Sequence, residues 1–380
     1  MRIERFHIID STLREGEQFA LAHFTPEQKL QIAQALDDFG VDYMELTSPL
    51  ASPQSAADLR LMASRPRSFR LLTHVRCNHD DAQLAIDTGV DGVDVLFATS
   101  SALRTVSHGY SIDEIIEIGA SVVRRITDAG LEARFSSEDS FRSDPDDLLR
   151  IYRAIDKARP ARVGLADTVG VATPRQVYEL VSMVRRNVEC DIEFHAHNDT
   201  GCAIANALAA LEAGASHIDV TVLGIGERNG IVPLGGMIAR LLTLQPELVE
   251  RYDLEMLPQI DAMVAEILGI EVPFNTPVTA ANAFHHKAGM HTKAVLADPH
   301  AYEVMDPGRF GLERQILAGH RLVGRHAIRD RAALLGIAFD DDQLRAVTNE
   351  VKRRSDDGPL ANDELDALLM HWAVTKEGVG

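Results

Sequence analysis

The chain has 380 residues, of which 46% are hydrophobic and 25% are charged, and its formal net charge of −19 at pH 7 disfavours broad contact with nucleic acid. No apolar run reaches the roughly 18 residues of a membrane span, and the amino terminus, MRIERFHIID, carries charges where a signal peptide is apolar. We therefore expect a cytoplasmic globular protein without a membrane or nucleic-acid partner.

Short apolar or β-branched runs alternate with amphipathic segments, a pattern typical of parallel α/β architecture. The expected strands are Phe6–Asp10, Tyr43–Thr47, Phe69–His74, Gly92–Phe97, Glu132–Ser136, Arg162–Ala166, Asp191–His195 and His217–Leu223. Between them, Thr25, Ser111 and Thr173 each precede a Gln or Glu three residues later, which predicts capping boxes. Eight such units, with no Gly-x-Gly-x-x-Gly after the first strand, favour a closed (β/α)₈ (TIM) barrel over an open sheet.

The alternation of strands and helices fades at about Glu255. We expect a catalytic barrel over residues 1–255, a linking subdomain over 256–315, and a helical carboxy-terminal subdomain over 316–380. The linking subdomain carries the run HHKAGMH, from His285 to His291. Taken alone, this run is more typical of a solvated basic loop than of a catalytic element.

Chemically capable side chains follow the first and seventh expected strands, where barrel enzymes build their sites. The sequence reads STLREGEQ after the first strand and EFHAHND at the end of the seventh. Because side chains alternate along a strand, Glu193, His195 and His197 face one side. With Glu15, the two histidines form a set suited to a divalent metal and Lewis-acid catalysis. A hydrogen-bonded histidine pair and a surface ion pair of Glu15 are the alternatives.

Further polar residues fall at or just beyond other strand ends. They are Arg14, His74, Arg134 and Thr168. A guanidinium group grips a carboxylate with two bonds, which a 2-oxo dicarboxylate would use, although a salt bridge across the barrel mouth is the alternative for any one arginine. In the motif RFSSED, Ser136 adds a hydroxyl, and Glu138 either orients an acid–base partner or caps the following helix.

These motifs resemble the acyltransferase branch of the metal-dependent barrel family that includes homocitrate synthase, 2-isopropylmalate synthase and hydroxymethylglutaryl-CoA lyase. The resemblance covers Ile8 to about Gly324 and runs through STLREGEQ, THVRC, RFSSEDSFR, GLADTVG, EFHAHNDTGCA, GIGERNGIVPLGG and HHKAGMH. Isopropylmalate synthases typically carry an aspartate in place of Glu15, an asparagine ligand in place of Ile231, and an additional regulatory domain. At these points the chain is most similar to the lysine-pathway homocitrate synthases.

The resemblance implies a Claisen-type condensation of acetyl-CoA with 2-oxoglutarate that gives homocitrate and CoA, the first step of the 2-aminoadipate route to lysine. It implies that Glu15, His195 and His197 hold a divalent metal ion such as Mg²⁺, Mn²⁺ or Zn²⁺. It also implies that the oxo acid contacts Arg14, His74, Arg134, Ser136 and Thr168. Lysine, as a feedback inhibitor, would contact Asp94, Ser136, Thr168 and Glu193.

For catalysis, the resemblance implies that His291 is the base, assisted by Glu138, and that Arg14 stabilises oxyanion charge. It further implies a homodimer with crossed active sites, in which His291 comes from the partner subunit. The family often has a tyrosine five residues after this histidine, where the chain has Leu296.

Three other functions are alternatives for this chain. The first is condensation of acetyl-CoA with another 2-oxo acid, as in 2-isopropylmalate synthase, and the second is a non-catalytic sensor of lysine or of an oxo acid. The third is a lyase, which would need a cysteine loop that none of Cys77, Cys190 and Cys202 matches.

Overall fold

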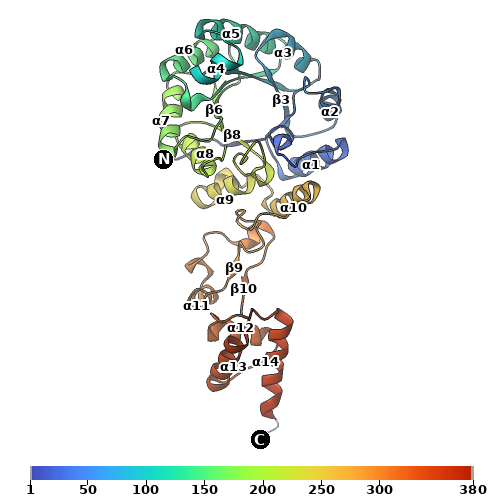
Figure 1. The fold of residues 1–380 in the computed structure, drawn as a ribbon, viewed down its shortest axis with the longest axis vertical. Helices are drawn as coiled ribbons and strands as arrows, with labels where there is room; N and C mark the ends of the chain where they lie inside the picture. Colours follow the sequence, from blue (N-terminus) through green and yellow to red (C-terminus); the bar gives the residue numbers. More distant parts are fainter. Residues whose placement is uncertain (1, 378–380) are drawn as a thin grey trace. The chain divides into compact units, whose positions relative to one another are not determined.

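The computed structural model describes residues 2–377 and contains eight parallel strands closed into a barrel (Figure 1). The strands are β1 (His7–Asp10), β2 (Tyr43–Leu46), β3 (Arg70–Arg76), β4 (Gly92–Ala98), β5 (Glu132–Glu138), β6 (Arg162–Asp167), β7 (Asp191–Ala196) and β8 (His217–Val220). They follow one another around the barrel, and β8 closes on β1 with Ile8 opposite Ile218. The expected TIM barrel is confirmed, and each expected strand is found with its ends shifted by three residues or fewer.

Helices surround the barrel, as Figure 1 shows in blue to yellow. They are α1 (Pro26–Phe39), α2 (Pro53–Ala63), α3 (His79–Ile86), α4 (Ser101–Ser107), α5 (Ile112–Asp128), α6 (Pro145–Asp156), α7 (Pro174–Arg185), α8 (Ala203–Glu212), α9 (Leu234–Leu244) and α10 (Leu257–Leu268). The three expected capping boxes are present at the starts of α1, α5 and α7, where Thr25, Ser111 and Thr173 accept from the backbone N–H three residues later. These caps satisfy N–H groups that a helix start leaves free.

The two faces of each strand differ in chemistry. On β5, Phe135 lies against α5 at Gly119, whereas its neighbours Arg134 and Ser136 line the barrel cavity. On β7, Phe194 is fully buried between Glu193 and His195. The apolar residues therefore pack between barrel and helices, and the charged residues gather inside the barrel.

The described residues divide into two compact units, one up to Ala280 and one from Ala281 onward. The second unit holds two short parallel strands, β9 (His285–His286) and β10 (Gln315–Ile316), and the helices α11 (Gly289–Ala297), α12 (Arg325–Leu334), α13 (Asp341–Arg354) and α14 (Asn362–Glu377). Its core includes Ile328, Val347 and Leu369 from the last three helices. The expected boundaries at residues 255 and 315 stay predictions.

No helix within residues 2–377 is both long and apolar enough to cross a lipid bilayer.

Candidate active site

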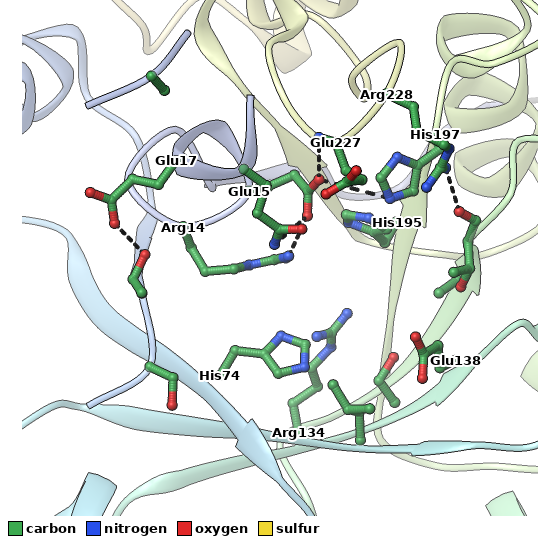
Figure 2. Close-up of a pocket in the computed structure, with 18 of the residues that line it drawn as sticks. Arg14, Glu15, Glu17, His74, Arg134, Glu138, His195, His197, Glu227 and Arg228 are labelled. Atoms are coloured by element: carbon green, nitrogen blue, oxygen red, sulfur yellow. Dashed lines mark hydrogen bonds and ion pairs between the residues drawn. The ribbon is translucent and has the colours of Figure 1, made fainter. Parts of the chain in front are cut away.

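A cavity of about 680 Å³ opens at the carboxyl ends of the barrel strands (Figure 2). The structure brings nine of the sequence-predicted residues to its wall: Arg14, Glu15, His74, Arg134, Ser136, Glu138, Thr168, His195 and His197. Residues without a predicted role also line it, and they include Glu17, His23, Thr47, Glu227 and Arg228. This position matches the end of the barrel where enzymes with this fold carry their catalytic groups.

Glu15, His195 and His197 converge on one point of the cavity wall, and each offers one ligand atom within 4.8 Å of the others. Nε2 of His197 lies 3.9 Å from Oε1 of Glu15, and the two imidazole rings cross at 71° with centroids 5.0 Å apart. Ligand atoms bound about 2.1 Å from one ion lie about 3 to 4 Å apart, so a slight contraction of this cluster would accommodate a metal. The side chains therefore fit a divalent cation.

The protonation states of these side chains suit metal ligation. Burial, followed by the charge of Arg14, lowers the pKa of His195 to about 4, and burial, followed by His195, lowers the pKa of His197 to about 4. Burial would raise the pKa of Glu15, but Arg14 and the backbone N–H of Glu227 contribute to lowering it below its ordinary value. At neutral pH the cluster thus holds one carboxylate and two neutral imidazoles, each with a free lone pair.

Asp219 on β8 orients His195. Its Oδ2 lies 2.9 Å from Nδ1 of His195, and the Asp219 side chain is 1% exposed. A buried carboxylate accepts a hydrogen bond, so Nδ1 carries the proton and Nε2 stays free for the cavity. No role for Asp219 was predicted from the sequence.

Arg14 links the metal-ligand cluster to the floor of the cavity. Its Nη1 donates to Oε2 of Glu15 and its Nε donates to Oε2 of Glu45, each at 2.6 Å. Nδ1 of His74 lies 3.3 Å from Oε1 of the same Glu45, and burial lowers the pKa of His74. Figure 2 shows Arg14 and His74 facing the same cavity, so a cation and a neutral imidazole are presented together.

Arg134 adds a buried guanidinium group to the wall and is 2% exposed. Its Nη2 lies 2.7 Å from Oε1 of Glu193, and its Nη1 lies 3.8 Å from Oδ2 of Asp94. Gly164 makes room for the guanidinium group, because a Cβ there would lie 2.6 Å from Nε of Arg134. A larger residue at position 164 would therefore displace the guanidinium group from this place.

Two of the expected lysine contacts, Asp94 and Glu193, do not line the cavity, although both contact Arg134, which does. Burial raises the pKa of Asp94, and burial raises the pKa of Glu193 to about 8. Neither oxygen of Asp94 has a hydrogen-bond partner within residues 2–377. Of these three charged residues, only Arg134 therefore lines the cavity.

Glu138 ends β5 and its side chain lies at the cavity. The alternative that it caps a helix is wrong, because Asp139 precedes the next 3₁₀ turn and Asp144 caps α6. Burial, followed by the nearby Asp139, raises the pKa of Glu138. Thr168, on the neighbouring segment, accepts from the backbone N–H of Asp139 at 2.9 Å.

A loop in the motif GIGERNGIVPLGG closes one side of the cavity, and no role was predicted for its charged residues. The backbone N–H of Glu227 donates to Oε1 of Glu15 at 2.9 Å. Arg228, at φ 55°, donates to Oδ1 of Asp199 at 2.8 Å and to the carbonyl oxygen of Thr168 at 2.7 Å. This loop therefore forms hydrogen bonds both with Glu15, a candidate metal ligand, and with Thr168, a candidate substrate contact.

His291, the predicted base, lies in α11 of the second unit. Its ring stacks on Tyr302 with centroids 4.2 Å apart and an angle of 29°. The neighbouring Glu303 accepts from Arg314 through both oxygens, at 2.7 and 2.5 Å, and lies 2.7 Å from Nε2 of His286. No role was predicted for Tyr302, because the family resemblance indicates a tyrosine at position 296, where the chain has leucine.

Two family models match the chain. The HMGL-like model matches residues 5–264, and the model described as homocitrate synthase post-HMGL domain-like matches residues 278–359. Among solved structures, an HMG-CoA lyase from Bacillus subtilis covers 72% of this chain and 97% of its own with a TM-score of 0.63 and 21% identity. This likeness concerns the fold.

Curated relatives match nearly the whole chain. The mitochondrial homocitrate synthase of Saccharomyces cerevisiae is 52% identical over 97% of this chain and 84% of its own length. The cytosolic isozyme from the same yeast is 51% identical over 97% of this chain and 87% of its own length. Because relatives occur in both compartments, the cytoplasmic location stays a prediction.

Proposed function

The chain belongs to the HMGL-like family, and from that premise we infer that it is a homocitrate synthase, an acyltransferase that condenses acetyl-CoA with 2-oxoglutarate to homocitrate and CoA. The observation that carries this conclusion is 52% identity to a curated homocitrate synthase over 97% of the chain. The reaction would open the 2-aminoadipate route to lysine.

The cavity offers what a 2-oxo dicarboxylate needs at each end. Arg14 presents a guanidinium group beside Glu15, so it suits the carboxylate and ketone at one end of the substrate. The distal carboxylate would then meet a deeper set of donors, which comprises His74, Arg134, Ser136 and Thr168. A branched aliphatic oxo acid has no distal carboxylate to pair with this set.

We propose that Glu15, His195 and His197 hold a divalent metal ion, and a mixed carboxylate–imidazole set is compatible with Mg²⁺, Mn²⁺ and Zn²⁺. Bound there, the metal supplies a Lewis acid that polarises the substrate ketone. Asp219 keeps the proton of His195 on Nδ1, and Arg14 keeps Glu15 ionised.

The base in this proposal is His291, assisted by Glu138. The imidazole takes a proton from the methyl group of acetyl-CoA, and the resulting enolate attacks the ketone carbon of 2-oxoglutarate. Arg14 stabilises the negative charge on the former ketone oxygen until a proton converts it to the tertiary alcohol of homocitryl-CoA. Water then cleaves the thioester and releases CoA. Tyr302 stacks on His291, and in this proposal its phenol acts as a further acid–base group beside the imidazole.

We propose that the protein works as a homodimer in which His291 serves the barrel of the partner subunit. We also propose that lysine competes with 2-oxoglutarate and uses Asp94, Ser136, Thr168 and Glu193. Lysine titration against 2-oxoglutarate tests this, and unchanged rates at saturating lysine would refute it.

The experiment that tests the function is thiol release from acetyl-CoA by purified, metal-loaded protein. It compares 2-oxoglutarate with 2-oxoisovalerate, pyruvate and no acceptor, before and after chelation. Release only with 2-oxoglutarate, lost on chelation, is expected. Thiol release with a different acceptor would support the same condensation reaction with another oxo acid as substrate. No thiol release with any acceptor would favour a non-catalytic sensor.

A further inference from the structure

A second cavity, of about 350 Å³, lies entirely within the second unit. Its walls come from the residue after β9, the loop after β10 and the turn that joins α13 to α14. The charged and polar residues that line it are Lys287, His320, Arg321, Ser355, Asp356 and Asp357. The reaction described above uses none of them.

The paired strands β9 and β10 build the basic wall of this cavity. The backbone N–H of Leu317 donates to the carbonyl oxygen of His286 at 2.9 Å, which sets Lys287 beside the loop that follows β10. Nε2 of the buried His320 lies 2.8 Å from the carbonyl oxygen of Leu317 and fixes that loop. Arg321 is the next residue, so its position depends on a buried hydrogen bond.

The opposite wall is tied to the same loop. The backbone N–H of Leu360 donates to the carbonyl oxygen of Gly319 at 2.9 Å. A Cβ at Gly319 would lie 2.3 Å from the carbonyl oxygen of Leu360, so only glycine permits this approach. Ser355 on that wall is 5% exposed, and its hydroxyl has no hydrogen-bond partner within residues 2–377. A ligand oxygen would satisfy this buried hydroxyl group.

The cations at this cavity differ from those at the barrel cavity. Arg14, Arg134 and Arg228 at the barrel are all held by carboxylates. Lys287 and Arg321, in contrast, are exposed and form no ion pair within the described part of the chain. In a protein with a net charge of −19, two unpaired cations beside a cavity are suited to a phosphate group.

The two acidic residues of the cavity favour a ligand that carries hydrogen-bond donors in addition to its phosphate. Asp356 and Asp357 would repel a bare anion, but a carboxylate accepts hydrogen bonds from ribose hydroxyls and from the 6-amino group of adenine. A ligand that combines a phosphate group with adenosine would therefore match both the basic and the acidic residues of the cavity. Acetyl-CoA, the acyl donor in the proposed reaction, ends in a 3′-phosphorylated adenosine diphosphate.

We propose that this cavity binds the 3′-phosphoadenosine end of acetyl-CoA, an inference that rests on the proposed function. Lys287 and Arg321 contact the phosphates, the Ser355 hydroxyl donates to one of them, and Asp356 and Asp357 accept from the nucleoside. Lys287 lies two residues before α11, and His291 is in the first turn of that helix. The proposed base and one of the proposed phosphate contacts therefore lie four residues apart in the same unit.

A kinetic test distinguishes binding of the nucleotide end of acetyl-CoA from reaction at its thioester end. Arg321→Ala and Lys287→Ala are each expected to raise KM for acetyl-CoA about tenfold with little change in kcat. KM for S-acetyl-N-acetylcysteamine, a thioester without a nucleotide, should stay as in the wild type. Arg345→Ala is the matched control, because this arginine is exposed on α13 and does not line the cavity.

A binding test is independent of turnover. Adenosine 3′,5′-bisphosphate should bind the full-length wild-type protein and Arg345→Ala, and it should bind Arg321→Ala at least tenfold more weakly. This result would support the site even if no acceptor gives condensation, in which case the proposed function alone fails. Unchanged KM for acetyl-CoA and unchanged nucleotide binding in both variants would overturn the proposal. Displacement of the nucleotide by equimolar inorganic phosphate would overturn it too, since it would mean a bare anion site.

Discussion

Nδ1 of His195 lies 2.9 Å from Oδ2 of Asp219, so a candidate metal ligand on β7 is held by a buried carboxylate on β8. The register explains the pairing, because Glu193 lies opposite His217 and Phe194 opposite Ile218. Continuing that register by one residue sets Asp219 beside His195. The carboxylate fixes both the ring orientation and the position of the ring proton.

Asp219→Asn should weaken metal binding about 10- to 100-fold, because a neutral amide no longer supplies the negative charge that makes the imidazole a stronger metal ligand. Competition of the apo-protein with a chromogenic chelator measures this affinity without any turnover. Glu132→Gln is the control, since Glu132 pairs with Arg162 and Arg70 and does not line the site cavity. Equal metal affinity in Asp219→Asn and wild type would remove Asp219 from the site.

Tyr302→Phe keeps the ring that stacks on His291 and removes only the hydroxyl group. If the phenol shares the proton of the base, kcat should fall about tenfold or more while KM for 2-oxoglutarate stays the same. Steady-state kinetics with both substrates measures the change. Leu296→Ala is the comparison at the position where the family tyrosine was expected. Wild-type kcat in Tyr302→Phe would limit Tyr302 to stacking.

Gly164→Ala should displace Arg134, because the added Cβ would lie 2.6 Å from its Nε atom. We expect KM for 2-oxoglutarate to rise about tenfold as this buried guanidinium group leaves its place. Gly308→Ala is the matched control, since a Cβ there meets only the Asp306 side chain at 3.4 Å or more. An unchanged KM in Gly164→Ala would argue against substrate binding by Arg134.

Asp42, at the other end of the barrel, is expected to stabilise the fold in a pH-dependent way. Burial raises its pKa, but hydrogen bonds from His7, Arg251 and the backbone N–H of Ile8 outweigh that and lower the pKa from 3.8 to about 2. A lowered pKa means that the stabilisation is complete above the unfolded value and is lost as pH falls from about 4 towards 2. Asp42→Asn should therefore cost about 2 kcal/mol at pH 7.

Urea unfolding of wild type and Asp42→Asn at pH 7, 5 and 3.5 measures the difference in free energy of unfolding. The difference should be the same at pH 7 and 5 and smaller at pH 3.5. Asp341→Asn removes an exposed pair with Arg329 and should change the midpoint little. A difference that grows as the pH falls would contradict the assignment.

The crossed dimer predicts complementation between two inactive variants. His291→Ala and His195→Ala remove a residue from different units. If each site combines the barrel of one subunit with His291 of the other, random mixing after dissociation should restore about a quarter of wild-type activity. Thiol release before and after mixing is the measurement. No recovery in dimers verified by mass photometry would place His291 and the barrel of one site in the same subunit.

The barrel could be predicted from sequence because each strand is a short apolar run with polar residues at its carboxyl end. Nine of the side chains named at or near those ends meet at one cavity for the same reason, whereas Asp94 and Glu193 do not line it. Their roles stay predictions. The alternation along β7 correctly put Glu193 and His195 on one face, but it could not show that Glu193 pairs with Arg134 and does not line the cavity.

Other parts depend on contacts that a linear pattern does not carry. In the sequence, Asp219 is not distinguishable from other strand residues, because its position beside His195 follows from the register of β7 and β8. Tyr302 reaches His291 through a turn after α11, and Arg228 reaches Asp199 from a backbone with φ at 55°. The cavity of the second unit needs the pairing of β9 with β10, two strands too short to leave a periodic signal.

The charges enclosed by the barrel constrain how this enzyme can evolve. Arg134 and Arg162 both pair with Glu193, so replacing Glu193 with a neutral residue would leave two buried guanidinium groups with one carboxyl partner fewer. Single substitutions there should mostly be lost to misfolding before their effect on specificity can be selected. A descendant that accepts a substrate without a distal carboxylate would therefore arise through compensated pairs, in which an arginine and its acid change together.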